Sequence, residues 1–241
     1  MQLIIKDNYK ELSKEAAKIV IEQIKSKPNS VIGFATGDTP LGLYKELIKA
    51  HKNGLDFSQI ITFNLDEYLG LPDSHGQSYN YYMWDKLFNH INIKKENVNI
   101  PDGTAFDPEK FCEEYEAKIK KSGGIDLQIL GIGRNGHIGF NESGSKFNSR
   151  TRIVNLTKQT RKDNAKFFED INNVPVQAIT MGISTILKSK KIILLANGKE
   201  KAENIRKLMN ESKTEKFPAS ALKDHPNTII LVDKDAASLL D

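Results

Sequence analysis

Hydrophobic residues along the chain form short continuous runs, and longer amphipathic segments separate these runs. Unbroken runs rich in Val, Ile and Leu are typical of parallel strands that are buried on both faces. The runs lie at residues 31–35, 60–65, 125–131, 191–196 and 228–232, with a weaker run at 178–181 and another strand-like run starting near residue 3. Apolar residues spaced three and four apart predict helices at 9–25, 41–50, 79–88, 108–120, 158–168 and 199–208.

This alternation of strands and helices predicts an α/β fold. Right-handed crossovers would give a doubly wound, mostly parallel sheet with flanking helices, which is a Rossmann-like three-layer arrangement. No internal repeat, low-complexity linker or break in composition divides the 241 residues. We therefore expect a single domain over residues 1–241.

Composition excludes several classes of protein. With 39% hydrophobic and 27% charged residues, the chain is neither disordered nor a disulfide scaffold. The net charge of +4 is not gathered in a basic block, so we expect no nucleic-acid partner. No apolar run approaches a membrane span, and the N-terminus has no signal-peptide pattern. The single cysteine, Cys112, is interpreted as a buried small side chain, and the expected compartment is the cytoplasm.

Polar residues gather where the predicted strands end, which is where ligands bind in open α/β sheets. The first cluster is Thr36, Gly37, Asp38 and Thr39, ahead of the predicted helix 41–50. Backbone N–H groups and hydroxyls at a helix start favour a phosphate-binding turn. Alternatively, Thr39 simply caps the helix and Pro40 occupies its first position.

A pair of acids, Asp66 and Glu67, follows the run at 60–65. In extended backbone their side chains point to opposite sides, so only one would face a pocket. A carboxylate there could take a proton from carbon. Acidic residues at the end of a strand are also common without any catalytic role.

The segment 131–142 is the densest polar stretch after a buried run. It begins with G-x-G-x-x-G, but a poor helix follows and the motif lies late in the chain, so dinucleotide binding is not favoured. It also places His137 five residues before Glu142, an arrangement suited to proton transfer near neutral pH. The five histidines lack metal-ligand spacing, so we expect no metal site. Arg161 and Lys201 are candidate phosphate ligands, or ordinary surface charges.

Together these motifs resemble the glucosamine-6-phosphate deaminase family (NagB type). The matching stretches are ATGDTP (35–40), NLDEYLG (64–70), GIGRNGHIGFNE (131–142), SRTRI (149–153) with TR (160–161), and NGKEK (197–201). The resemblance implies a NagB/RpiA-like fold and the conversion of glucosamine 6-phosphate and water to fructose 6-phosphate and ammonia, without a cofactor.

The resemblance also implies roles for individual residues. His137 would open the sugar ring, with Glu142 orienting it and Asn135 completing the group. Asp66 would move the proton from C2 to C1. The turn of Thr36, Gly37, Asp38 and Thr39 would bind the phosphate together with Arg161 and Lys201.

The chain departs from the family pattern at three positions. Asn135 stands where many members have Asp, which would lower the tendency of His137 to be protonated. Ser143 stands where Pro often follows the Glu. Val154 replaces a Lys used by the larger allosteric members, so we expect a monomer or small homo-oligomer without that regulation. The segment 151–173 is a candidate lid.

Two alternative functions stay open. One is a non-catalytic sugar-phosphate sensor on the same fold. The other is a 6-phosphogluconolactonase-like hydrolase, which carries a similar phosphate turn.

Overall fold

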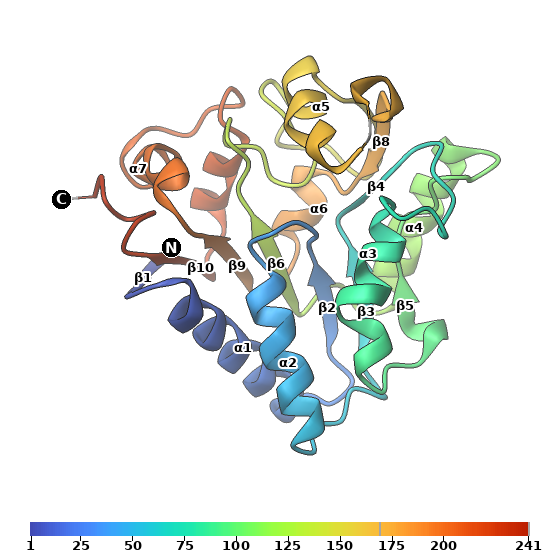
Figure 1. The fold of residues 1–241 in the computed structure, drawn as a ribbon, viewed down its shortest axis with the longest axis horizontal. Coiled ribbons are helices and arrows are strands. Elements are labelled where there is room, and N and C mark those ends of the chain that lie inside the picture. The colour runs from blue at the N-terminus through green and yellow to red at the C-terminus, as the bar shows by residue number, and fades with distance from the viewer. Residues whose placement is uncertain (169, 241) are drawn as a thin grey trace.

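A seven-stranded parallel sheet forms the centre of the molecule (Figure 1). The computed structural model describes residues 1–168 and 170–240. In spatial order the strands are β1 (Gln2–Lys6), β10 (Thr228–Asp233), β9 (Ile192–Ala196), β6 (Leu127–Gly131), β2 (Val31–Phe34), β3 (Ile61–Asn64) and β5 (Val98–Asn99). Every neighbouring pair in this sheet is parallel. The predicted α/β class is confirmed.

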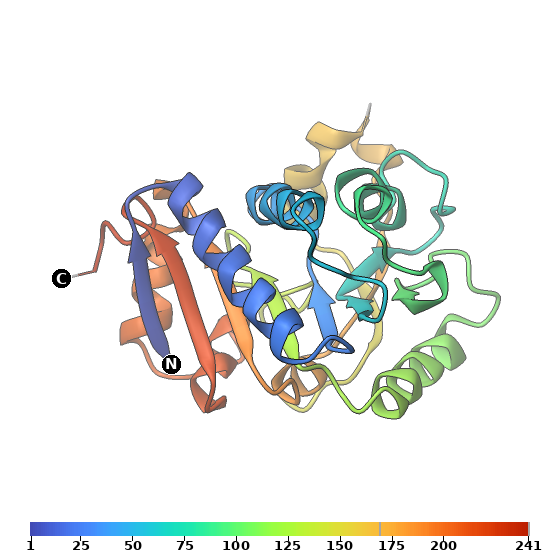
Figure 2. The same cartoon turned by 90° about the horizontal axis from the view of Figure 1, so that it is seen from below.

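Helices cover both faces of this sheet (Figure 2). One face carries α1 (Tyr9–Ser26), α2 (Leu41–Lys52) and α3 (Tyr79–Lys86), and the other carries α4 (Pro108–Lys121), α6 (Ile183–Leu187) and α7 (Ala202–Asn210). Strand β9 shows why its sequence is apolar throughout. Ile193 and Leu195 pack in the core beside α1, while Ile192 and Leu194 pack in the core beside α7. This confirms the three-layer arrangement.

A second, antiparallel sheet lies beyond the main one. It consists of β4 (Asp66–Tyr68), β8 (Gln177–Thr180) and β7 (Arg152–Asn155), with β8 in the middle. The weak run at 178–181 was expected among the parallel strands, and that expectation is wrong. Such a short apolar run satisfies either kind of pairing, because its sequence does not specify the partner.

Helix α5 (Lys158–Asn164) follows β7 and lies over the carboxyl edge of the main sheet (Figure 1). The predicted helix 158–168 is therefore shorter than expected and continues as a 3₁₀ turn over Ala165–Phe167. Residue 169, inside the predicted lid 151–173, lies outside the described residues. That the segment acts as a lid stays a prediction.

The turn before α2 differs from the simple capping interpretation. The helix begins at Leu41, and Pro40 at the cap position is already in helical conformation and makes no side-chain capping hydrogen bond. Thr39 therefore precedes the cap position and does not cap the helix. The alternative interpretation of this turn as an ordinary capped helix start is wrong.

Two further expectations concern single features. Cys112 is buried, as predicted. Among the residues that the structure describes, no helix has both the length and the apolar character needed to cross a bilayer.

Neighbouring strands β2 and β6 mark the point where the chain direction across the sheet reverses. From β2 the chain passes through α2 to β3 on one side, and β9 is the neighbour of β6 on the other. The loops after β2 and β6 therefore diverge and leave a crevice at the carboxyl edge, the usual ligand position in such sheets.

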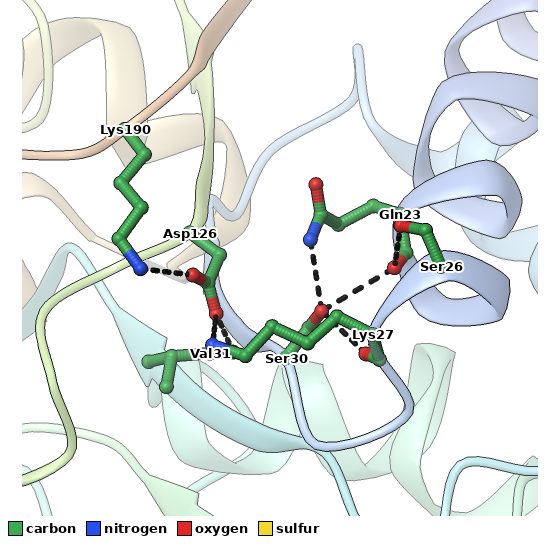
Figure 3. Close-up of polar contacts among 7 residues, drawn as sticks. All are labelled: Gln23, Ser26, Lys27, Ser30, Val31, Asp126 and Lys190. Atoms are coloured by element: carbon green, nitrogen blue, oxygen red, sulfur yellow. Dashed lines mark hydrogen bonds and ion pairs between the residues drawn. The ribbon is translucent and has the colours of Figure 1, made fainter.

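At the opposite edge, the buried carboxylate of Asp126 joins the amino ends of these two strands (Figure 3). It accepts hydrogen bonds from Lys27 Nζ at 2.5 Å, Lys190 Nζ at 2.7 Å and the Val31 backbone N–H at 2.8 Å. Burial raises the pKa of Asp126, but these three donors outweigh burial and hold the pKa below the ordinary 3.8.

We predict that Asp126→Asn lowers the free energy of unfolding at pH 7 by about 1.5–3 kcal/mol, because charge-assisted bonds are lost. A depressed pKa means that this contribution is present above pH 3.8 and disappears as the pH falls through the folded-state pKa. Urea unfolding of both proteins at pH 7 and in acid measures the difference.

Asp7→Asn is the matched control, because Asp7 pairs with Lys234 while both side chains stay about 70% exposed. Its effect should be clearly smaller. Equal losses for the two variants would contradict the assigned importance of Asp126.

Candidate active site

A cleft of about 370 Å³ lies at the carboxyl edge between the loops that follow β2 and β6. It collects most of the residues predicted as the site, although they come from distant parts of the sequence. The predicted residues that line it are Thr36, Gly37, Asp38, Thr39, Asp66, His137 and Lys201. Lining residues that the sequence did not single out include Tyr79, Phe140, Thr160 and Lys166.

Three tyrosine hydroxyls hold the backbone carbonyls of the turn after β2. Tyr44 donates to Ala35 O, and Tyr82 donates to Gly37 O at 2.5 Å. Tyr9 bonds to the carbonyls of Asp38 and Thr39 at 3.1 and 3.0 Å. With its carbonyls engaged by tyrosines, the turn is suited to present N–H groups and threonine hydroxyls to an anion.

Two lysines bring positive charge to this turn. Lys201 ends the 3₁₀ turn Lys199–Lys201 after β9, and burial lowers its pKa from the ordinary value. Lys166 follows α5, and its Nζ lies 3.3 Å from Asp38 Oδ2. The sequence offered no signal for Lys166, because many lysines occupy similar helical segments.

Arg161 was predicted beside these cations, and the structure places it elsewhere. Its guanidinium donates to the carbonyl oxygens of Ile171 at 3.0 Å and Val174 at 3.2 Å. It is not among the described residues that line the cleft. Its predicted contact with phosphate therefore gains no support from this geometry.

Asp66 is the buried acid of the cleft, with 6% of its surface exposed. Burial and the neighbouring Glu67 carboxylate raise its pKa to about 8, although the nearby Phe140 N–H lowers it. Glu67 points the other way and accepts backbone N–H groups of α3. The expectation that only one acid faces the pocket is confirmed.

His137, Asn135 and Glu142 form a chain of hydrogen bonds. His137 Nδ1 lies 2.5 Å from Asn135 Oδ1, and Asn135 Nδ2 donates to Glu142 Oε2 at 3.1 Å. Because the amide nitrogen faces Glu142, its oxygen must accept from the imidazole. Nδ1 therefore carries the proton, which leaves Nε2 as the proton acceptor.

Burial lowers the pKa of His137 and the Lys201 ammonium lowers it further, while Glu142 raises it. A lowered pKa keeps the imidazole neutral near pH 7, so it can take up a proton. Asn135 and Glu142 themselves lie behind the imidazole and do not line the cleft.

Glu142 also connects this chain to α5. Its Oε1 accepts from Thr160 Oγ1 at 2.5 Å and from Thr157 Oγ1 at 3.1 Å, and Thr157 caps α5. The orientation of the imidazole is thus connected to the start of α5, which lies inside the segment 151–173 predicted as a lid.

Glycines in the loop after β6 allow close packing and not dinucleotide binding. A Cβ atom on Gly133 would lie 2.1 Å from the His137 ring, so only glycine fits against it. No helix follows the motif before β7 in the described residues. The same residues contain no group of three or more His, Cys, Asp or Glu side chains that could hold a metal ion.

Comparison with known proteins defines the family. Residues 6–231 match the family model of glucosamine-6-phosphate isomerases/6-phosphogluconolactonases. The chain is 56% identical to a glucosamine-6-phosphate deaminase of Thermoanaerobacter pseudethanolicus, covering all of this chain and 95% of the relative. It is also 56% identical to a glucosamine-6-phosphate deaminase of Clostridium novyi over the full length of both. The chain therefore belongs to this family.

Solved structures agree with this assignment. A monomeric glucosamine-6-phosphate deaminase of the NagB superfamily superposes with a TM-score of 0.97 at 50% identity, covering 99% of this chain and all of that one. A 6-phosphogluconolactonase from Trypanosoma brucei superposes with a TM-score of 0.82 at 19% identity, covering 100% and 98% of the two chains. The second likeness shows a shared fold alone.

Proposed function

We propose that this protein converts glucosamine 6-phosphate and water to fructose 6-phosphate and ammonia. The observation that carries the proposal is that the His137 imidazole and the buried Asp66 carboxyl group line one cleft together with the turn Thr36–Thr39. The full-length relatives at 56% identity bear the name of this activity. The lactonase alternative is supported by the family model, whose description names both activities, and by 6-phosphogluconolactonase structures at 19–23% identity, well below the identity of the relatives named as deaminases.

At the phosphate end, the turn Thr36–Thr39 and the ammonium of Lys201 would bind the anion. Lys166 supports the same end, because it lies against Asp38 in the turn. Binding energy at this end orients carbons that react several bonds away.

His137 would open the ring. Opening moves a proton from O1 to O5, and the acceptor at Nε2 suits that transfer near neutral pH. The Asn135 and Glu142 chain fixes the ring tautomer, since the Nδ1 proton is held by the amide oxygen. An amide transmits orientation without adding a second negative charge.

Asp66 would then move the proton of the open-chain sugar from C2 to C1. A carboxylate whose pKa is raised to about 8 is a stronger base than an ordinary one. The imine that results at C2 adds water and releases ammonia. The reaction balances without a cofactor, because the oxidation of C2 is matched by the reduction of C1.

The proposal also includes a monomeric state and a cytoplasmic location. The superposed deaminase with a TM-score of 0.97 is described as monomeric, and a single buried cysteine is compatible with a reducing compartment.

A dual-product assay tests the proposal. We expect ammonia and fructose 6-phosphate to appear in equal amounts from glucosamine 6-phosphate without added metal or nicotinamide. Hydrolysis of 6-phosphogluconolactone without ammonia release would favour the lactonase. Ligand-induced thermal stabilisation with neither product would favour the sensor.

Asp66→Asn tests the proposed base. We expect kcat to fall by roughly 10²–10⁴-fold with KM nearly unchanged, since the amide cannot accept the C2 proton. Thermal unfolding is the control for correct folding of the variant. Because its pKa is raised to about 8, Asp66 lowers the free energy of unfolding as the pH rises from 3.8 towards 8. Asp66→Asn should therefore be at least as stable as the wild type at pH 7. Near-normal turnover would remove Asp66 from this role.

Lys201→Ala tests the phosphate end. We expect KM for glucosamine 6-phosphate to rise roughly 10- to 100-fold, because a charge-assisted contact with phosphate is lost. Lys199→Ala is the matched control, since Lys199 lies in the same 3₁₀ turn with an exposed side chain. Similar KM values for the two variants would contradict the assignment.

A further inference from the structure

Glu67 is a buried carboxylate that the proposed mechanism does not use. It is 1% exposed and lies next to Asp66 on β4, with its side chain on the opposite side of the strand. Burying a carboxylate costs free energy unless hydrogen bonds compensate for the lost hydration. The groups that bond to Glu67 therefore show which parts of the fold it connects.

Its hydrogen bonds connect two elements. Glu67 Oε1 accepts from the backbone N–H of Tyr68 at 2.8 Å and of Tyr79 at 2.9 Å, and Oε2 accepts from the Asn80 N–H at 2.8 Å. Tyr79 and Asn80 are the first two residues of α3. The carboxylate thus ties β4 to the start of this helix, where unpaired N–H groups favour a negative charge.

Helix α3 supplies two tyrosines to the site. The Tyr79 side chain lines the cleft, and Tyr82 donates its hydroxyl to the Gly37 carbonyl of the phosphate turn. Strand β4 supplies Asp66. One carboxylate therefore sets the relative position of the proposed base, one wall of the cleft and a support of the phosphate turn.

We propose that Glu67 is a positioning residue for the deamination, which bridges β4 and α3 so that Asp66 is held in place relative to the phosphate turn. This inference rests on the proposed function. It gives the second acid of the NLDEYLG segment a task of its own: Asp66 faces the substrate, and Glu67 fixes the strand that carries it.

The same arrangement has an electrostatic consequence. Among the described residues, the titratable groups around the two acids include Asp73, Tyr68, Tyr79 and Tyr115. Burial raises the pKa of Glu67 to about 7, and its three N–H donors lower it. An ionised Glu67 in turn raises the pKa of Asp66. Removing this charge should therefore lower the pKa of Asp66.

Glu67→Gln tests the proposal, with kcat and kcat/KM measured across pH. We expect kcat to fall by roughly 10- to 100-fold, because a misplaced base reacts more slowly, with a smaller change in KM. The limb of the pH profile on which Asp66 loses its proton should move to lower pH. A residue that only stabilises the fold would not move that limb.

Glu116→Gln is the matched control. Glu116 is also a buried carboxylate, and it accepts hydrogen bonds from Thr151 and Thr185 away from the cleft. This variant should lower the melting temperature and leave the pH profile unchanged. If Glu67→Gln behaves like Glu116→Gln, the proposal is overturned.

Glu67→Asp keeps the charge and shortens the side chain, so it covers the case in which Glu67→Gln fails to fold. It should lower kcat while the limb stays in place, and wild-type kcat would overturn the proposal. The assay of the wild-type protein distinguishes failure of the proposed function from failure of this inference. No ammonia from the wild type ends the proposed function and this inference together, whereas an active wild type with an unaltered Glu67→Gln profile ends this inference alone.

Discussion

The site depends on two parallel neighbours, β2 and β6, whose chains continue in opposite directions. Their parallel pairing brings both carboxyl ends to one edge, and the divergence of the following loops opens the cleft there. The turn Thr36–Thr39 follows β2, and the loop with His137 follows β6. At the other edge, Asp126 joins the amino ends of the same pair, so the register of these strands is held from the side away from the chemistry.

The sequence predicted six of the seven strands of the main sheet, because most of these strands are buried on both faces and read as apolar runs. It missed β5, which has only two residues. It also predicted Asp66, His137, Lys201 and the turn Thr36–Thr39 at the ends of strands, and these residues line one cleft because the parallel strands end at the same edge. It could not place β8, because antiparallel pairing with β4 and β7 depends on tertiary contacts. The sequence did not single out Lys166, which lies against Asp38 of the turn, and it predicted Arg161 there, which instead bonds to the Ile171 carbonyl. The sequence could not distinguish the two cations, because the folded path of the segment after β7 decides which one faces the turn.

Asp66 and Glu67 are adjacent buried acids on β4, and they affect the stability of the fold differently. The folded state holds a proton on Asp66 that the unfolded chain releases above pH 3.8, so this residue makes the protein less stable as pH rises towards 8. Glu67 offsets its own burial with three backbone N–H groups. The strand therefore combines one carboxyl group left reactive with one that is fully hydrogen-bonded.

The three tyrosines beneath the phosphate turn have a consequence for how an anion binds. Tyr9, Tyr44 and Tyr82 bond to backbone carbonyls of this turn, which restrains rotation of its peptide planes before any ligand binds. If this turn binds the phosphate as proposed, the reorganisation energy of binding is small, and the interaction with the dianion is available to orient the distant carbons. The tyrosine hydroxyls of α1, α2 and α3 thus preorganise the dipoles of the turn before a ligand enters.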